Sequence, residues 1–142
     1  MYKMKVLAPV SDIMTREVVK LNITDDLSKA EELFKKHSIR HIPVMQDNKL
    51  VGILSYADLL KVSLADFNED ENFVETVLYN MFSVEQIMTK NVVTVFSFTP
   101  IKEVAEILSV HDFRALPVIY ENHLVGMVTT TDIMKYLVAQ FD

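Results

Sequence analysis

Two short segments of the chain combine residue types that can bind a phosphorylated sugar. They read GILSYAD from residue 52 and GMVTTTD from residue 126, and in each a hydroxyl is followed three residues later by an aspartate. At a helix start, unpaired backbone N–H groups and the positive end of the dipole attract phosphate oxygens, and a hydroxyl adds a donor. A carboxylate one turn later can accept hydrogen bonds from a ribose diol. The four side chains concerned are Ser55, Asp58, Thr129 and Asp132.

The same pattern also has a purely structural interpretation. A hydroxyl followed three residues later by an acid is typical of a capping box, in which both side chains bond backbone N–H groups at the start of a helix. Such a cap needs no ligand, and a duplication copies caps as faithfully as binding sites. The pattern by itself therefore leaves a nucleotide site and a helix cap open.

An internal duplication organises the whole chain. A shift of 74 residues places residues 10–60 on residues 84–134 without a gap, with sixteen identical pairs in 51 positions. Chance similarity does not keep register over this length, so the chain holds two copies of one supersecondary unit.

Each copy predicts the element order β-α-β-β-α. A short β-rich run is followed by a helix, whose start is marked by Thr24 and two acids in the first copy and by Thr99 and Pro100 in the second. Two strands joined by a turn and a closing helix complete the copy. The β-rich runs are 18–21 and 92–95, the paired strands are 42–45, 50–54, 116–119 and 124–128, and the closing helices begin near Asp58 and Asp132.

This layout predicts a mixed α+β fold built from two repeats. The first repeat spans 8–65, an acidic linker with an added amphipathic helix spans 66–83, and the second repeat spans 84–141. About 50 residues bury too little apolar surface to be stable alone. We therefore expect the two sheets to pack about an approximate two-fold axis, which leaves a cleft with two related pockets.

The recurring residues resemble the cystathionine-β-synthase (CBS) domain family, in which a tandem pair forms the Bateman module. The resemblance rests on the Ile-Met-Thr segments that start at Ile13 and Ile87, on IRHIPV and FRALPV from residues 39 and 113, and on the two Gly-to-Asp segments. It covers about residues 8–141 and implies a stand-alone CBS-domain protein that forms a homodimer. It also implies an adenosine-derived ligand, AMP, ADP, ATP or S-adenosylmethionine, bound in the cleft between the repeats.

The resemblance further implies a role for each site residue. The two aspartates would hold the ribose hydroxyls, and Ser55 and Thr129 would face phosphate. Basic residues before the middle strand would contact phosphate, and the first strand would lie against adenine. The basic residues are Arg40, His41 and Arg114, and the first-strand positions are Val19, Lys20, Val93 and Thr94. Because many members have Thr at the position of Lys20, and because Ala115 replaces a cation, we expect two unequal pockets.

Composition excludes several functional classes. The chain has no cysteine, which excludes disulfides and Cys-based zinc sites, and its four histidines match no metal-ligand spacing. With 14 basic and 20 acidic residues and a net charge of −6, it lacks the clustered positive charge of a nucleic-acid-binding surface. No apolar run is long enough for a membrane span or a secretory signal, so we expect a cytoplasmic protein with no membrane or nucleic-acid partner.

Catalysis is not expected, because no nucleophile–base pair, metal cage or acid–base dyad remains after both repeats are assigned. We expect a regulatory sensor that requires no cofactor, binds an adenosine-derived molecule between its repeats and transmits occupancy to an unidentified regulated protein. The alternative is a ligand-independent dimerisation or interaction module with the same fold, in which Asp58 and Asp132 are only structural.

Overall fold

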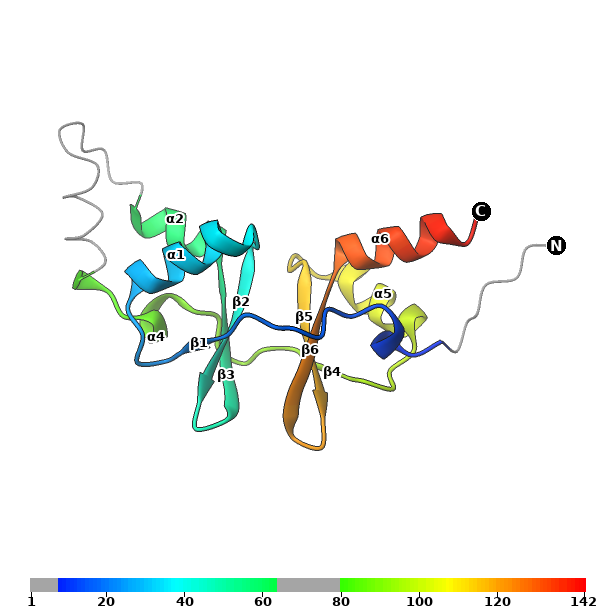
Figure 1. Cartoon of the computed structure of the whole chain (residues 1–142), viewed down its shortest axis with the longest axis horizontal. Helices are drawn as coiled ribbons and strands as arrows, with labels where there is room; N and C mark the ends of the chain where they lie inside the picture. Colours follow the sequence, from blue (N-terminus) through cyan, green and yellow to red (C-terminus); the bar gives the residue numbers. More distant parts are fainter. Residues whose placement is uncertain (1–7, 64–79) are drawn as a thin grey trace. The chain divides into compact units, whose positions relative to one another are not determined.

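A computed structural model describes residues 8–63 and 80–142 of the chain (Figure 1). The chain divides into two compact units. Unit 1 comprises Met1–Val18 together with Val93–Asp142, and unit 2 comprises Val19–Val92. Each unit combines helices with a three-stranded sheet, which confirms the predicted mixed α+β fold.

Unit 2 is built on a sheet with the strand order β1-β2-β3, in which β1 is parallel to β2 and β2 is antiparallel to β3. The β2–β3 hairpin turns through Asp47 and Asn48, whose φ angles are 50° and 66°. Two consecutive positive φ angles are typical of a tight type I′ turn, which asparagine tolerates well. The elements are β1 (Leu21–Asn22), α1 (Leu27–His37), β2 (His41–Gln46), β3 (Lys49–Ser55), α2 (Tyr56–Ser63) and α4 (Val84–Ile87).

Unit 1 repeats this arrangement with the strand order β4-β5-β6. Its hairpin turns through Glu121 and Asn122, with φ angles of 48° and 67°, so both copies use the same turn type. The elements are the 3-10 turn η1 (Val10–Asp12), β4 (Val95–Phe96), α5 (Ile101–Val110), β5 (Ala115–Tyr120), β6 (His123–Thr129) and α6 (Thr130–Ala139).

The paired strands and closing helices lie where the sequence predicts them, but the first strands and the caps of α1 and α5 differ. β1 begins at Leu21 and β4 at Val95, because pairing with the neighbouring strand starts only at these residues. The α1 cap is Asp26, which accepts a hydrogen bond from the Lys29 N–H at 2.8 Å. Thr99 does not cap α5: its hydroxyl accepts from the Phe96 N–H at 2.9 Å, and Pro100 takes the N-cap position.

Each unit encloses its own apolar core. Helix α1 buries its apolar face in unit 2, and α5 buries the equivalent face in unit 1. In unit 2 the buried cluster is Leu21, Leu27, Ala30, Phe34, Ile42, Val44, Leu54, Leu59, Val84 and Met88. In unit 1 it is Val10, Met14, Val95, Val104, Leu108, Leu116, Val118 and Val128.

The opening segment of each sequence copy packs into the unit that contains the sheet of the other copy. Val10 and Met14, from the start of the first copy, belong to the core of unit 1. The Thr15 N–H donates to the Met127 carbonyl at 2.8 Å, and the Met127 N–H donates back at 3.0 Å. In unit 2, Val84 and Met88 take the same roles. Sequence copies and compact units therefore have different boundaries.

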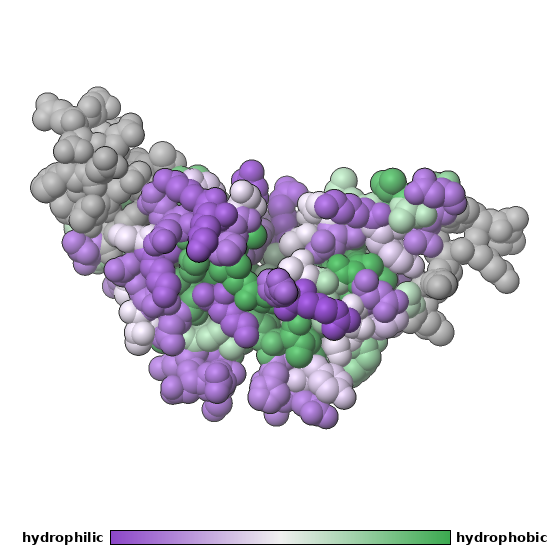
Figure 2. Space-filling view, viewed as in Figure 1, coloured by the Kyte–Doolittle hydropathy of each residue, from purple (hydrophilic) through white to green (hydrophobic). Residues whose placement is uncertain are grey.

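Helices α6 and α1 differ in the hydrophobicity of their exposed side chains. Helix α6 exposes three apolar side chains, and hydrophobic atoms are visible along it in Figure 2, whereas the surface over α1 is mainly hydrophilic. These side chains are Met134, Leu137 and Val138, and the exposed Phe141 follows the end of the helix. The predicted amphipathic helix of the 66–83 linker falls mostly outside the described residues.

Candidate functional site

Four of the predicted residues of unit 2 meet at one end of its hairpin. His41 begins β2 and lies opposite Ser55, the last residue of β3. The Arg40 carbonyl accepts a hydrogen bond from the Tyr56 N–H at 2.8 Å, which holds the start of α2 beside Arg40. Asp58 follows in the first turn of α2. A cation, an imidazole, a hydroxyl and a carboxylate are thus brought together by strand register and one helix start.

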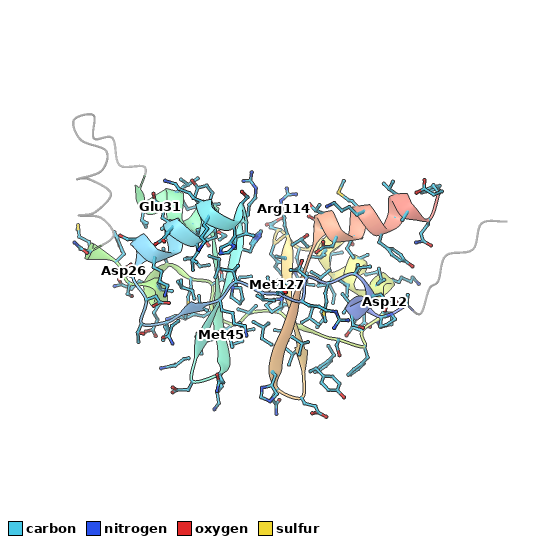
Figure 3. The ribbon with its side chains drawn as sticks, viewed as in Figure 1. Asp12, Asp26, Glu31, Met45, Arg114 and Met127 are labelled. Carbon is cyan, nitrogen blue, oxygen red and sulfur yellow. The ribbon has the colours of Figure 1, made fainter. Side chains whose placement is uncertain are left out.

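Unit 1 builds the same arrangement without the imidazole. Ala115 begins β5 opposite Thr129, and the Thr130 N–H donates to the Arg114 carbonyl at 3.0 Å. Figure 3 shows Arg114 just before the first residue of β5, at the edge of the sheet where β6 continues into α6. The Ala115 side chain is a buried methyl group, 5% exposed, so it offers no polar group to a ligand.

The helix start in unit 1 is a complete capping box. The Asp132 N–H donates to the Thr129 hydroxyl oxygen at 3.2 Å. In return, Asp132 Oδ2 accepts from the Thr129 N–H at 2.9 Å and from the Thr129 hydroxyl at 3.1 Å. The structural interpretation of this motif is therefore present in the fold, and both the hydroxyl proton and one carboxylate oxygen are engaged by it.

The helix start in unit 2 is only half closed. The Asp58 N–H donates to the Ser55 hydroxyl oxygen at 3.0 Å, but the Asp58 carboxylate makes no return bond within the described residues. Its contact is an ion pair with Lys61, 3.6 Å from Oδ1 to Nζ, in which Asp58 is 28% and Lys61 77% exposed. A hydroxyl has one proton and two lone pairs, so Ser55 can accept from Asp58 and still donate to a ligand.

The first-strand residues lie apart from these helix starts along the chain. Val19 and Lys20 precede β1, and Val93 and Thr94 precede β4. The Lys20 side chain lines a groove of about 520 Å³ whose other walls carry Asp25 and Asp47. Lys20 thus lines a groove that contains none of the other predicted site residues, and its predicted role toward a nucleotide stays a prediction.

We expect the removal of the aspartate to lower the free energy of unfolding by different amounts at the two helix starts. Asp132→Ala removes the two bonds that close the Thr129 cap, so we expect a loss of about 1 kcal/mol, the usual cost of a lost cap. Asp58→Ala removes one exposed ion pair, which is worth roughly 0–0.5 kcal/mol. Urea unfolding of both variants measures the difference, and equal losses would show that the caps are equivalent.

Comparison with known proteins identifies the fold and its motifs. The family model described as "CBS domain" matches residues 10–65 and 84–139, which is most of the chain. The chain belongs to the CBS domain family. A CBS domain-containing protein of Dictyostelium discoideum is 31% identical over 137 residues, covering 95% of this chain and 93% of that protein.

Other CBS-domain relatives are either much longer or carry ligands. Homoserine O-acetyltransferase of Methanosphaera stadtmanae is 34% identical over 128 residues, which cover 89% of this chain but only 23% of the enzyme. The CBS domain pair of protein MJ0100 has been crystallised with 5′-methylthioadenosine and S-adenosyl-L-methionine. It superposes with a TM-score of 0.77 at 26% identity, covering 94% of this chain and 98% of that one.

Two further features of the described residues bear on the site. None of their helices is both long and apolar enough to cross a membrane. Within residues 8–63 and 80–142, no group of three or more histidine and acidic side chains could hold a metal ion. One feature was missed by the sequence analysis: a pocket beside Arg40 formed with Phe34, Lys35 and Tyr56. Its residues belong to a helix end and a strand–helix junction, which only the fold brings together.

Proposed function

We propose that this CBS-domain chain is a non-catalytic regulatory module that binds adenosine-derived small molecules at the two helix starts. The observation that carries the proposal is the duplicated constellation of a hydroxyl, an acid and a neighbouring arginine: Ser55, Asp58 and Arg40 in unit 2, and Thr129, Asp132 and Arg114 in unit 1. The two adenosine derivatives bound by the CBS pair of MJ0100 support the ligand class.

The chemistry of the constellation suits a nucleoside. A carboxylate accepts both protons of a ribose diol, and an arginine beside a helix N-terminus favours a phosphate or a carboxylate. Unit 2 offers Arg40, His41 and an undonated Ser55 hydroxyl proton, whereas unit 1 offers Arg114 beside the buried Ala115. In this proposal, ligands that carry a phosphate therefore bind at the helix start of unit 2 in preference to that of unit 1. Transmission of occupancy to a regulated protein, a homodimeric state and binding between the repeats remain predictions.

A thermal-shift series with S-adenosylmethionine, 5′-methylthioadenosine, AMP, ADP, ATP and GTP tests the ligand class. A ligand at about 100 times its Kd that binds only the folded chain adds roughly 2.7 kcal/mol, which raises Tm by several degrees. We expect an adenosine compound to raise Tm while GTP does not, and we expect Asp58→Asn with Asp132→Asn to remove the response.

The control variant carries Glu32→Gln and Glu103→Gln, which neutralise one exposed carboxylate on α1 and one on α5. It should respond as the unmodified chain does. Asp58→Asn alone should weaken ATP binding more than Asp132→Asn alone, because unit 2 holds more cations. A wild-type chain with no response to any adenosine compound would instead favour the ligand-independent interaction module, since both hydroxyls already serve as helix caps.

A further inference from the structure

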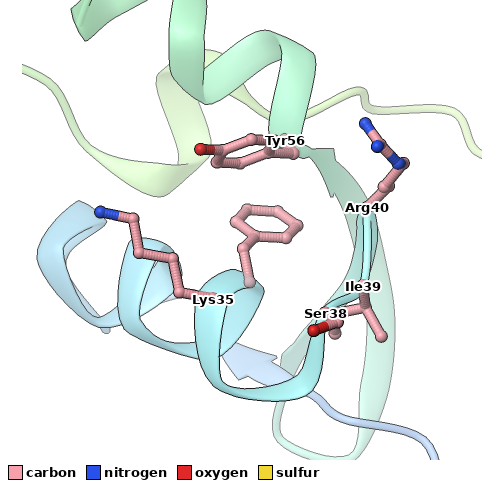
Figure 4. A pocket seen from close by; sticks show the side chains of 6 residues that line it. Lys35, Ser38, Ile39, Arg40 and Tyr56 are labelled. Atoms are coloured by element: carbon pink, nitrogen blue, oxygen red, sulfur yellow. The ribbon is translucent and has the colours of Figure 1, made fainter.

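Unit 2 contains a second pocket, on the side of its sheet that carries α1 and α2 (Figure 4). The pocket encloses about 240 Å³, which is less than the roughly 300–1,000 Å³ typical of sites for drug-sized ligands. It shares only Arg40 with the proposed nucleotide constellation. The lining residues are Phe34, Lys35, Ser38, Ile39, Arg40 and Tyr56.

The middle of the pocket is apolar and aromatic. The Phe34 ring forms its floor and is 3% exposed, and the Tyr56 ring stands 5.3 Å away, centroid to centroid, at an angle of 53°. Ile39 adds an aliphatic wall. The two rings thus contact each other in the tilted arrangement that aromatic pairs prefer, and an incoming ring can pack against this pair but not between its rings. This part of the pocket suits a small planar body.

The rim of the pocket carries one net positive charge. Lys35 Nζ lies 2.6 Å from Glu31 Oε1, so this pair is balanced. The Arg40 guanidinium has no ion pair or hydrogen bond with any described residue, and Figure 4 places it beside Tyr56 at the edge of the pocket. A guanidinium binds a carboxylate through two parallel hydrogen bonds, and the hydroxyls of Ser38 and Tyr56 are further donors. A single negative charge matches this rim.

The sequence copy in unit 1 lacks this combination. The positions equivalent to Lys35, Ser38 and Tyr56 are occupied by Ser109, Asp112 and Thr130. Leu108 replaces Phe34, so both aromatic rings of the pocket and the Lys35 cation are missing there. Phe113 replaces Ile39, and Asp112 adds a carboxylate two residues before Arg114. Since strand order and hairpin turns are the same in both copies, the pocket of unit 2 reflects its own side chains and not the shared fold.

We propose that the pocket formed by Phe34, Ser38, Arg40 and Tyr56 binds a small aromatic carboxylate. The ring packs against the Phe34–Tyr56 pair at the mouth of the pocket, and the carboxylate accepts hydrogen bonds from the Arg40 guanidinium. This site takes a ligand class different from the adenosine derivatives, although both classes would use the Arg40 guanidinium.

Benzoate is the probe that tests the site. We expect benzoate to shift the amide NMR signals of Ser38, Arg40 and Tyr56, while benzylamine, of the same shape but opposite charge, and acetate, with no ring, do not. Phenyl phosphate, a dianion, should bind more weakly than benzoate. A tighter response to phenyl phosphate, an equal response to acetate, or no response to benzoate would each overturn the assignment.

Three variants locate the binding without disturbing the core. Lys35→Glu turns the net charge of the rim negative and should weaken benzoate binding by at least tenfold, whereas Lys36→Glu, one residue further on the same helix and outside the pocket, should change it less than threefold. Arg40→Gln should also weaken binding about tenfold, the usual effect of losing a charged hydrogen bond.

Arg114→Gln in unit 1 is the matched control and should leave benzoate binding unchanged. Asp58→Asn separates the two proposals, because it should affect only adenosine compounds. Benzoate binding that survives in Asp58→Asn but is lost in Lys35→Glu supports this site even if no nucleotide binds. Equal loss in Lys35→Glu and Lys36→Glu would show a non-specific charge effect and overturn it.

Discussion

Val10→Asp should unfold the unit that contains the second sequence copy, although Val10 belongs to the first. Val10 is completely buried among the apolar side chains of unit 1, and its N–H donates to the Thr99 carbonyl at 2.7 Å. An unpaired buried charge costs roughly 3–5 kcal/mol. Amide hydrogen exchange should show that β5 and β6 lose protection while β2 and β3 keep it.

Two substitutions serve as references for this result. Val110→Asp makes the same change on α5, where the side chain is 76% exposed, and should alter stability by no more than about 0.5 kcal/mol. Val84→Asp is the reciprocal change, because Val84 is buried in unit 2, and it should release β2 and β3 instead. Loss of protection in β2 and β3 on Val10→Asp would contradict the exchanged packing of the opening segments.

Gly52→Val should destabilise unit 2 by about 3 kcal/mol. A Cβ at this position would overlap the Met88 sulfur and would lie 2.9 Å from both Met88 Cγ and the Thr89 carbonyl oxygen. Overpacking of this kind costs about 1–3 kcal/mol. It also strains the two hydrogen bonds of 3.0 and 2.9 Å that join Ile53 and Thr89. Urea unfolding gives the loss directly.

A double variant separates the two contacts of Gly52. Adding Met88→Ala to Gly52→Val removes the side-chain overlap but leaves the contact with the Thr89 carbonyl, so we expect only partial recovery relative to Met88→Ala alone. Ala57→Val, an exposed site in the first turn of α2, is the control and should cost no more than about 0.7 kcal/mol, the range of helix propensities. Full recovery in the double variant would show that the backbone approach is unimportant.

Local chemistry explains what the sequence could predict. Apolar runs on either side of Asp47-Asn48 and Glu121-Asn122 were sufficient to place both hairpins, because strand pairing and turn type depend on neighbouring residues. The same holds for the caps at Ser55 and Thr129, since a hydroxyl can reach the N–H three residues later in any regular helix start. These elements and the duplication of the hydroxyl–acid motif also carry the family resemblance.

Some features of the structure depend on contacts that the spacing of residues in the sequence does not reveal. The sequence around Thr99 predicts a helix cap, but the Thr99 hydroxyl accepts a hydrogen bond from the N–H of Phe96, the last residue of β4. Whether Asp58 or Asp132 closes its cap depends on side-chain rotamers, which the repeated motif leaves open. The pocket at Arg40 likewise needs the end of α1 to pack beside the start of α2.

The sequence by itself determined that this protein has two β-α-β-β-α copies with a hydroxyl and an acid at each closing helix. The tertiary structure decided which core each opening segment completes. Val10 and Met14 present the same apolar pattern as Val84 and Met88, so either segment matches either copy in hydrophobicity and spacing. Only three-dimensional packing, through the close approach of Met14 to Gly126 and of Met88 to Gly52, distinguishes the two arrangements.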